Sequence, residues 1–297
     1  MNTQSIFVKI FGGLGNQMFQ LACAYSLSVR NGVPIVLEVS SVSGLDKRAL
    51  GHTPRSFGLS VFESLWGLID KQSLKKRIRY GENAVLRLLY RYKQITIYKE
   101  KAMRFDPAIF QLVVPVFLEG YFQSEKYFNH CEPEIRSLFR FPEHVLFKTE
   151  YLNQISESTC PVSVHFRRGD FVYDNVFHEN HGVCDYAYYQ TAMNFIMRKF
   201  NTAHFFIFSD DISQIRSDIA HWELPMTFVL PVDSEPEWID MMLMSKCRHH
   251  IIANSTYSWW AAWLSESMDK VVVAPQKWFA GHAYDTSDLI PVGWLRM

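Results

Sequence analysis

The stretch VSVHFRRGDF, residues 162–171, changes character in its middle. Up to Phe166 it reads as a buried strand, in which Val164 and Phe166 share one face and His165 points to the other. Two arginines, a glycine and an aspartate then follow directly. A surface turn closed by a salt bridge is one explanation. A phosphate site is the other, because ligands of open α/β sheets bind at the carboxyl ends of the strands.

Short apolar stretches of the same kind recur along the chain. The predicted strands are 6–11, 34–39, 113–119, 162–166, 204–209, 226–231, 249–253 and 271–275. The predicted helices between them are 16–31, 124–140, 184–200, 234–247 and 256–268. Several strands are continuous apolar runs, as expected of strands buried on both faces. Their alternation with helices predicts an α/β fold with parallel sheets and crossover helices.

This alternation is regular only in part of the chain. After residue 160 strand and helix follow each other at short intervals, whereas residues 40–110 show no such order. We therefore place a boundary within 141–160 and expect two α/β halves, residues 1–155 and residues 156–297.

Composition narrows the function classes. The 297 residues contain 30 Lys and Arg and 30 Asp and Glu, and a chain with no net charge is not typical of a nucleic-acid binder. The five cysteines are scattered without a CxxC pair, so we read them as reduced thiols. The sequence shows neither the pattern of a signal peptide nor an apolar run of about 18 residues. These features predict a cytoplasmic protein.

One segment is strongly basic. Residues 71–104 contain eleven Lys and Arg and only two Glu. A solvated helix face explains such a segment most simply. The alternative is peripheral contact with the inner face of an anionic membrane or with a lipid-linked substrate.

The first predicted strand leads into GGLGNQMFQ, residues 12–20. Gly12, Gly13 and Gly15 allow a tight turn and close approach of a ligand to the backbone, and a helix start favours an anion. Glu38 stands where the ribose-binding acid of a dinucleotide site would stand, but the third glycine of that pattern is missing. A purely structural turn is equally compatible. The amides of Asn16 and Gln17 suit recognition of hydroxyl groups.

Polar residues also follow three later strands. Adjacent residues point apart, so Arg167 and Arg168 cannot easily bind one group, and we expect one to face the ligand while the other holds the loop, with Asp170 as a partner. After the strand 204–209 come Asp210 and Asp211, which could bind a ligand or cap the next helix. The residues that follow the strand 249–253 are Asn254, Ser255 and Thr256, at the start of a helix rich in tryptophan. That helix start is suited to phosphate, and the tryptophans to core packing.

HENHGVCD, residues 178–185, resembles a metal site only superficially. His178 and His181 are three residues apart, so the H-E-x-x-H spacing is absent, and no metal is expected. We interpret this run as a loop beside the site.

Together these strand ends offer arginines, backbone N–H groups, hydroxyls, amides and a carboxylate. That inventory suits a nucleoside diphosphate that carries a sugar. A triphosphate-hydrolysing P-loop and a nucleophile elbow are both absent from the sequence.

The motifs GGLGNQMFQ, HFRRGD, FSDD and NSTYSWWAAWL, in this order, resemble those of the bacterial α-1,2-fucosyltransferases of glycosyltransferase family 11. The resemblance extends from about residue 6 to about residue 280. It implies a GT-B-type fold, in which two Rossmann-like halves with parallel sheets face a central cleft. It also implies GDP-fucose as donor, a galactose-terminated glycan as acceptor, inversion at the fucose anomeric carbon, and no cofactor or metal. The second half would then bind GDP-fucose and the first half the acceptor.

The resemblance also implies roles for individual residues. Arg167 is expected on the β-phosphate of the donor, His165 and Asp210 or Asp211 near the guanosine, and Ser255 and Thr256 near the diphosphate. Asn16 is expected in the cleft, and we count Gly13, Gly15 and Asn254 among the donor contacts. No motif identifies the catalytic base, for which Asp174, His178 and Glu179 are the candidates. Phe171 replaces a tyrosine that many relatives have, so a hydroxyl role is lost there.

Two other classes remain open from the residues alone. Gly13, Gly15 and Glu38 would also fit an NAD-dependent oxidoreductase. A non-catalytic module that binds a sugar nucleotide could carry the same phosphate contacts.

Overall fold

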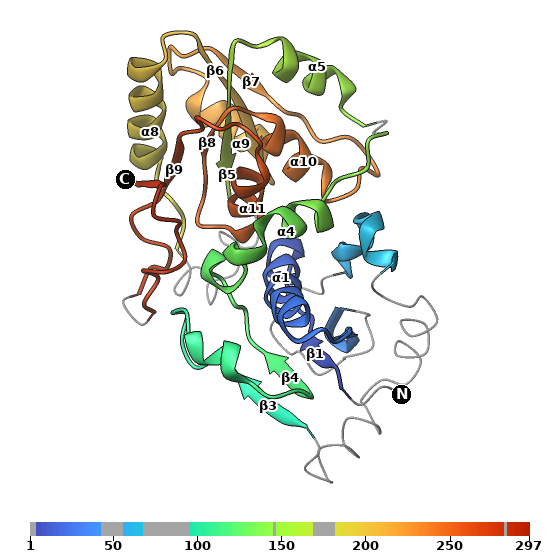
Figure 1. Cartoon of the computed structure of the whole chain (residues 1–297). Coiled ribbons are helices and arrows are strands. Elements are labelled where there is room, and N and C mark those ends of the chain that lie inside the picture. The colour runs from blue at the N-terminus through green and yellow to red at the C-terminus, as the bar shows by residue number, and fades with distance from the viewer. Residues whose placement is uncertain (1–3, 43–55, 68–94, 145–146, 169–181, 282–283) are drawn as a thin grey trace. The chain divides into compact units, whose positions relative to one another are not determined.

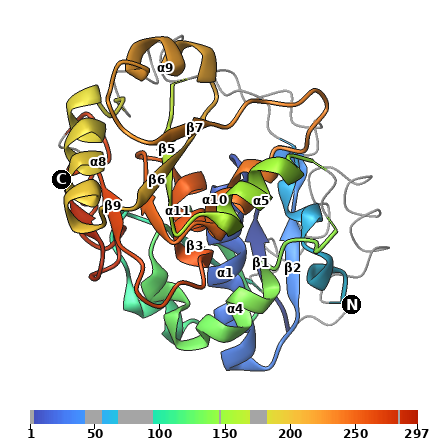
Figure 2. The same cartoon turned by 90° about the horizontal axis from the view of Figure 1, so that it is seen from above.

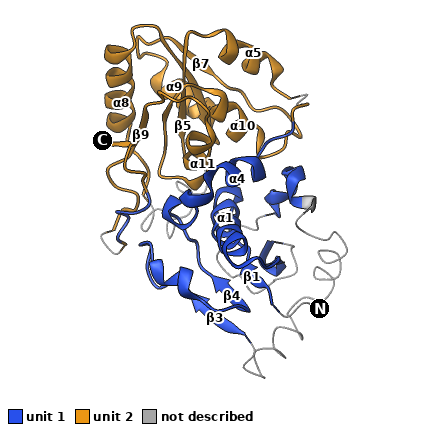
Figure 3. Ribbon diagram, in the orientation of Figure 1, with its two compact units in different colours: residues 1–142, 285–289 blue, residues 143–284, 290–297 orange. Residues whose placement is uncertain are grey.

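The computed structural model describes residues 4–42, 56–67, 95–144, 147–168, 182–281 and 284–297 (Figure 1). These residues form two compact units, coloured separately in Figure 3. Unit 1 comprises residues 1–142 and 285–289, and unit 2 comprises residues 143–284 and 290–297. Each unit is built around its own parallel sheet.

Unit 1 contains a four-stranded sheet in the order β2-β1-β4-β3. Its strands are β1 (Ile6–Lys9), β2 (Ile35–Glu38), β3 (Thr96–Lys99) and β4 (Val116–Glu119), and all pairs are parallel. Its helices are α1 (Leu14–Asn31) and α4 (Glu132–Leu138), with short 3-10 turns at Ser40–Val42, Gly58–Val61, Glu63–Gly67, Pro107–Gln111, Glu125–Tyr127 and Asn129–Cys131. Helix α1 ends at Gly32, whose φ of 63° a residue without a Cβ adopts readily.

Unit 2 contains a six-stranded parallel sheet in the order β10-β9-β8-β5-β6-β7. Its strands are β5 (Cys160–Phe166), β6 (Ala203–Ser209), β7 (Met226–Phe228), β8 (His249–Ile251), β9 (Val272–Ala274) and β10 (Leu295–Arg296). Its helices are α5 (Thr149–Glu157), α8 (Tyr186–Lys199), α9 (Ile212–Ile219), α10 (Ile239–Lys246) and α11 (Thr256–Leu264). Strand β5 is buried along its whole length because it lies between β8 and β6.

Helices cover both faces of the unit 2 sheet (Figure 2). One face of β5, with Val162, Val164 and Phe166, packs against α8 and α9 in a continuous apolar core. On the other face the ring of His165 lies 5.8 Å from that of Tyr257 on α11. The alternation predicted from the sequence is therefore confirmed, and His165 and Phe166 face opposite layers.

All eight predicted strands are confirmed, and two further strands lie at sheet edges. Strand β3 has mostly exposed residues, and β10 is only two residues long, so neither forms an apolar run. The helices α5 and α9 were also not among those predicted. Only Ile155 is buried in α5, which has nine residues, and α9 has eight, so both are shorter than the window over which a helical period is read.

Two predicted helices differ in extent from the observed ones. The prediction 124–140 is wrong in its first part, where two 3-10 turns precede α4, because Pro133 has no N–H and fits only the first turn of a helix. The prediction 234–247 starts too early. Helix α10 begins at Ile239, because Ser234 has a φ of 63° and is not helical.

The chain passes from unit 1 to unit 2 between Pro142 and Glu143, thirteen residues before the boundary expected at 155/156. Helix α5 therefore belongs to unit 2, where it packs on α10. Among the described residues no helix is both long and apolar enough to span a membrane.

Candidate active site

Strand order in unit 2 identifies where a ligand of this sheet should bind. From β5 the chain continues through α8 to β6 on one side, and from β8 it continues through α11 to β9 on the other. The chain thus leaves the neighbouring strands β5 and β8 in opposite directions. Such a place is called a topological switch point, and ligands of open α/β sheets bind there, outside the carboxyl ends of the strands. Arg167 follows β5 here, and Ser255 and Thr256 follow β8.

Arg167 is held by a carboxylate from the neighbouring strand. Its Nη1 lies 2.7 Å from Oδ2 of Asp210, and both side chains are about three-quarters buried. The other oxygen of Asp210 accepts the backbone N–H of Arg168 at 2.8 Å. Asp210 thereby joins the ends of β5 and β6 and fixes the guanidinium. This contact with Arg167 was not foreseen, since the family resemblance implied Asp210 or Asp211 near the guanosine.

Arg168 turns to the opposite side, as the geometry of a strand requires. Its guanidinium lies 4.8 Å from the ring centre of Tyr186 and pairs with Asp218 at 3.4 Å. The hydroxyl of Tyr186 also donates to Asp218. Arg168 therefore anchors the end of β5 to α8 and α9. Its expected partner Asp170 lies outside the described residues.

His165 is buried at the end of β5. Tyr189 donates its hydroxyl to the backbone oxygen of His165 at 3.0 Å. The Nδ1 atom of His165 has no hydrogen-bond partner among the described residues. Burial lowers the pKa of His165 to about 4, so the imidazole is neutral at physiological pH. A neutral ring with an unpartnered nitrogen is suited to a hydrogen bond with a ligand.

The start of α11 lies on the other side of this switch point. Ser255 caps the helix, with its hydroxyl accepting the N–H of Tyr257 at 3.3 Å, and Thr256 is the first helical residue. Positive partial charge at such a helix end favours an anion. The tryptophans of α11 are buried against each other, as expected for core packing.

Two of the predicted donor contacts have structural partners. Asn254 donates to the backbone oxygens of Gly182 and Trp278, both at 3.1 Å, and so fixes two loops. Asp211 caps α9 by accepting the N–H of Gln214 at 3.3 Å, which was the alternative foreseen for one of the two aspartates. Contacts of either residue with a donor stay predictions.

A buried cation lies between two acids at the same edge. The ammonium group of Lys148 is 1% exposed and lies 2.9 Å from Glu235 and 2.7 Å from Asp240. Burial raises the pKa of Asp240, and Lys148 opposes this shift. Tyr257 joins this cluster to α11, since its hydroxyl donates to Glu237 O and accepts the N–H of Met241. No motif in the sequence indicated the cluster, because its members are far apart along the chain.

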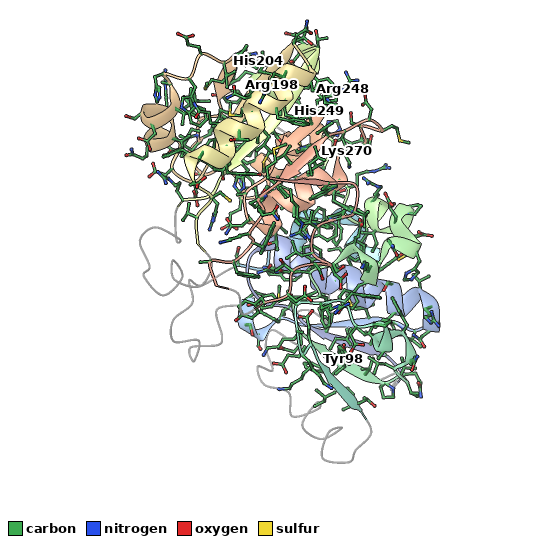
Figure 4. All side chains as sticks on the ribbon, turned by 90° about the vertical axis from the view of Figure 1, so that its left-hand side faces the viewer. Tyr98, Arg198, His204, Arg248, His249 and Lys270 are labelled. Carbon is green, nitrogen blue, oxygen red and sulfur yellow. The ribbon has the colours of Figure 1, made fainter. Side chains whose placement is uncertain are left out.

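The opposite edge of the unit 2 sheet has a different character. Figure 4 labels His204, Arg248 and His249, which stand at or just before the starts of β6 and β8. Arg248 pairs there with Asp269, and His249 stacks on Phe200. None of these residues was predicted to take part in the site.

In unit 1 the glycine loop is held by its own glutamine. Gly12 has a φ of 77°, and Gln17 donates to the oxygens of Gly12 and Ser56, both at 2.8 Å, while its own oxygen accepts the N–H of Gly58 at 3.0 Å. The amide of Gln17 is thus fully used inside the fold, and the hydroxyl-binding role suggested for it is wrong. Gly13 precedes α1 with open space where a Cβ would stand, and Gly15 is buried in the helix.

Asn16 pairs with a residue that the sequence analysis missed. Its Oδ1 accepts a hydrogen bond of 2.9 Å from Nε2 of Gln123, which follows β4. The signal was present, because 113–119 was predicted as a strand and Gln123 comes directly after it. Polar residues after that strand were not considered, although those after residues 11, 166, 209 and 253 were.

Several predicted residues lie outside the described part of the chain. These are Asp170, Asp174, His178 and Glu179, together with most of the basic segment 71–104. Phe171 and His181 belong to the same undescribed stretch as the candidate bases. Among the described residues no three His, Cys, Asp or Glu side chains gather in a way that could hold a metal ion.

Comparison with known proteins defines the class. The solved structure of POFUT1 in complex with GDP matches with a TM-score of 0.52 at 11% identity, and the match covers 92% of this chain and 98% of that one. The chain has two α/β units, each built on a parallel sheet. Together with this likeness, they define a GT-B-like fold. The predicted central cleft depends on how the two units are placed, so it stays a prediction.

Sequence comparison then gives the family. The pattern described as "Glycosyl transferase family 11" matches residues 72–296. The O-antigen biosynthesis glycosyltransferase WbnK of Escherichia coli is 33% identical, with 96% of this chain and 98% of that protein aligned. The alpha-1,2-colitosyltransferase of Escherichia coli is 28% identical over 98% of both chains. The chain belongs to glycosyl transferase family 11.

Proposed function

We propose that this glycosyltransferase is an inverting α-1,2-fucosyltransferase. It transfers L-fucose from GDP-β-L-fucose to the 2-hydroxyl of a terminal galactose on a glycan, such as an O-antigen unit or a lactose-like oligosaccharide. The observation that carries the proposal is the switch point of unit 2. Arg167 stands there on one side, fixed by Asp210, and the start of α11 stands on the other.

This arrangement suits a leaving nucleoside diphosphate. As the bond to fucose breaks, negative charge grows on the β-phosphate of GDP. A guanidinium that is already oriented and a helix N-terminus stabilise this charge most in the transition state, which is the requirement for catalysis. We assign Arg167 to the β-phosphate, Ser255 and Thr256 to the diphosphate, and His165 to the guanosine. Asp210 acts through Arg167 as a positioning residue.

The same groups can act without a divalent metal. An arginine and helix N–H groups supply the positive charge that other sugar-nucleotide sites take from a bound cation. We therefore propose metal-independent transfer. A base must accept the proton of the acceptor hydroxyl. Our candidates for this base are Asp174, His178 and Glu179.

The acceptor and the setting of the reaction are further parts of the proposal. WbnK of Escherichia coli is an O-antigen biosynthesis glycosyltransferase that aligns with nearly the whole chain, and this similarity supports an O-antigen unit as the acceptor. A cytoplasmic enzyme, with residues 71–104 in contact with an anionic membrane or a lipid-linked acceptor, stays our hypothesis for its location.

One experiment tests the reaction directly. Purified protein with GDP-fucose and lactose in EDTA should release GDP and form a product fucosylated at the 2-hydroxyl of galactose, as shown by linkage analysis. GDP-fucose binding without any turnover against a panel of galactosides would instead indicate a non-catalytic module. A thermal-shift panel should show stabilisation by GDP and none by NAD, and the reverse would favour an oxidoreductase.

A donor that carries colitose is the second candidate. It is favoured by the similarity to the α-1,2-colitosyltransferase of Escherichia coli, which spans nearly the whole chain. Competition between the two GDP-linked donors, with product analysis by mass, decides which sugar is transferred faster.

A further inference from the structure

We propose that Gln123 binds a hydroxyl group of the acceptor glycan, within a sugar subsite formed on unit 1 by Asn16, Gln123 and the ring of Tyr121. The inference rests on the proposed function for the identity of the glycan. It concerns the carboxyl edge of the unit 1 sheet, where the loops after the neighbouring strands β1 and β4 meet.

The first observation is a buried acceptor that the fold does not use. Gln123 is 6% exposed, and its Oε1 has no hydrogen-bond partner among the described residues. Its Nε2 donates to Asn16 Oδ1 at 2.9 Å, which fixes the amide and leaves the oxygen as an acceptor. Buried polar atoms are nearly always paired, and an unpaired one is destabilising. A ligand O–H would supply the missing donor.

The second observation is the way the loop of Gln123 is built. Gly120 cannot carry a side chain, since a Cβ there would lie 2.4 Å from the Cβ of Glu100. Phe122 has a φ of 53°, a conformation that aromatic residues rarely adopt. The carboxylate of Glu100 accepts the N–H groups of Tyr121 at 2.6 Å and Phe122 at 3.1 Å. Such unfavourable backbone geometry persists where the surroundings fix it, and it places Tyr121 and Gln123.

The third observation is an aromatic surface beside the amide. The rings of Phe11, after β1, and Tyr121, after β4, lie edge to face with 4.9 Å between their centres. Tyr121 is 38% exposed, an unusual degree for a large ring held in this way. A partly exposed ring next to fixed amides is a combination suited to a neutral pyranose, which offers an apolar face and hydroxyls at its edge.

The neighbouring surface is hollowed and lined by both aromatic and charged residues. A cavity of about 240 Å³ is lined by Tyr98, Glu100, Lys101, Ala102, Arg104, Phe105 and Asp106. Tyr98, labelled on β3 in Figure 4, donates to Asp106 at 2.7 Å, and its ring stacks on Phe122 beneath the loop. Glu100 belongs to both the cavity wall and the clamp on the loop, so the cavity adjoins the proposed subsite. Further sugar units of the glycan would extend into it.

Replacement of Gln123 by Met tests the proposal. The variant keeps the side-chain length and removes both the unpaired acceptor and the hydrogen bond that Gln123 donates to Asn16. We expect the KM for the galactoside acceptor to rise about threefold to tenfold, as for one lost hydrogen bond to a hydroxyl. The KM for GDP-fucose and the Kd for GDP should change less than about twofold. The Tm should change little, because removal of an unsatisfied buried oxygen offsets the lost bond to Asn16.

The matched control is Ser26→Ala in α1. Ser26 donates to the backbone oxygens of Cys23 at 2.9 Å and Tyr127 at 2.6 Å and has no part in the subsite. This variant should lower the Tm while both KM values stay unchanged. If Gln123→Met instead lowers the Tm with unchanged acceptor KM, or raises both KM values equally, the inference is wrong.

A binding measurement separates this inference from the proposed reaction. Saturation-transfer NMR with methyl β-galactoside reports binding to the wild type and to Gln123→Met without any turnover. Weaker binding by the variant supports the subsite even if GDP-fucose proves not to be the donor. Equal binding by both proteins overturns the subsite even if transfer from GDP-fucose is observed.

Discussion

The loops behind the two sheets differ in their chemistry although both sheets are parallel and helix-covered. In unit 2 the loops carry charge, with Arg167 held by Asp210 and Lys148 held between two acids. In unit 1 the loops after β1 and β4 carry an amide pair and an aromatic pair, Asn16 with Gln123 and Phe11 with Tyr121. One architecture thus places a fixed arginine behind the sheet of one unit and an amide pair with an aromatic pair behind the sheet of the other. The difference predicts a division of labour between leaving group and acceptor.

The largest effect should follow from removal of the charge in unit 2. Arg167→Ala should lower kcat by about 10² to 10³, the usual cost of a lost transition-state donor, with the far-UV spectrum unchanged. Steady-state GDP release measures it. Arg198→Ala on α8 is the control, because Arg198 is exposed and donates to the backbone oxygen of Asn194 within its own helix. Near-normal turnover of Arg167→Ala would contradict the proposed anion-binding role of unit 2.

A second test compares ion pairs in the two units. Lys148→Met should lower the free energy of unfolding by about 2 to 3 kcal/mol, because two carboxylates are left buried without their cation. Lys126→Met in unit 1 breaks a pair with Asp288 in which the lysine side chain is 44% exposed. That loss should be about 0 to 1 kcal/mol, since water screens the pair. Urea unfolding gives both values, and similar losses in the two variants would contradict the contrast.

A third test compares the response of the two units to mild acid. Burial lowers the pKa of His165 and of His249 to about 4, below the ordinary 6.5. The unfolded chain therefore binds more protons than the folded chain between about pH 6.5 and pH 4. The stability of unit 2 should fall through this window, by about 2 kcal/mol for each histidine, and should not change above pH 6.5 for this reason.

The described part of unit 1 contains one histidine, His130, and its side chain is exposed. Hydrogen exchange at pH 7 and pH 5 should consequently show greater loss of protection in β5 and β8 than in β1 and β4. His249→Gln should reduce the pH dependence of unit 2. Equal loss of protection in both units would show that the buried histidines do not decide the response to acid.

The sequence predicted the charged strand ends of unit 2 but not the amide pair of unit 1. The strand ends with charged residues stood out because Arg167 and Asp210 interrupt apolar runs. The pairing between them could not be read, since it depends on the adjacency of β5 and β6. Lys148 and Asp240 are 92 residues apart and meet only in the fold. Gln123 was missed for a different reason, because a single amide after a strand differs little from an ordinary surface residue until its burial is known.

The fold itself was more accessible than the site. Strands such as β5 and β6 are continuous apolar runs because neighbours cover them on both sides, and such runs are visible in one sequence. The edge strand β3 is mostly exposed, and the helix α5 has only nine residues with one of them buried, so neither forms an extended pattern. The sequence therefore predicted the elements that are highly buried and missed those that pack on only one face.

Unit 1 has a component that is made after most of unit 2. Its residues 285–289 come from near the end of the chain, and Asp288 accepts the N–H of Phe105 while its backbone oxygen accepts the hydroxyl of Ser124. Ser124 is the neighbour of Gln123. During synthesis the segment around Gln123 therefore emerges from the ribosome long before these partners do. Its final bonds form only after residues 143–284 of unit 2 have been translated, so the proposed acceptor surface should mature late.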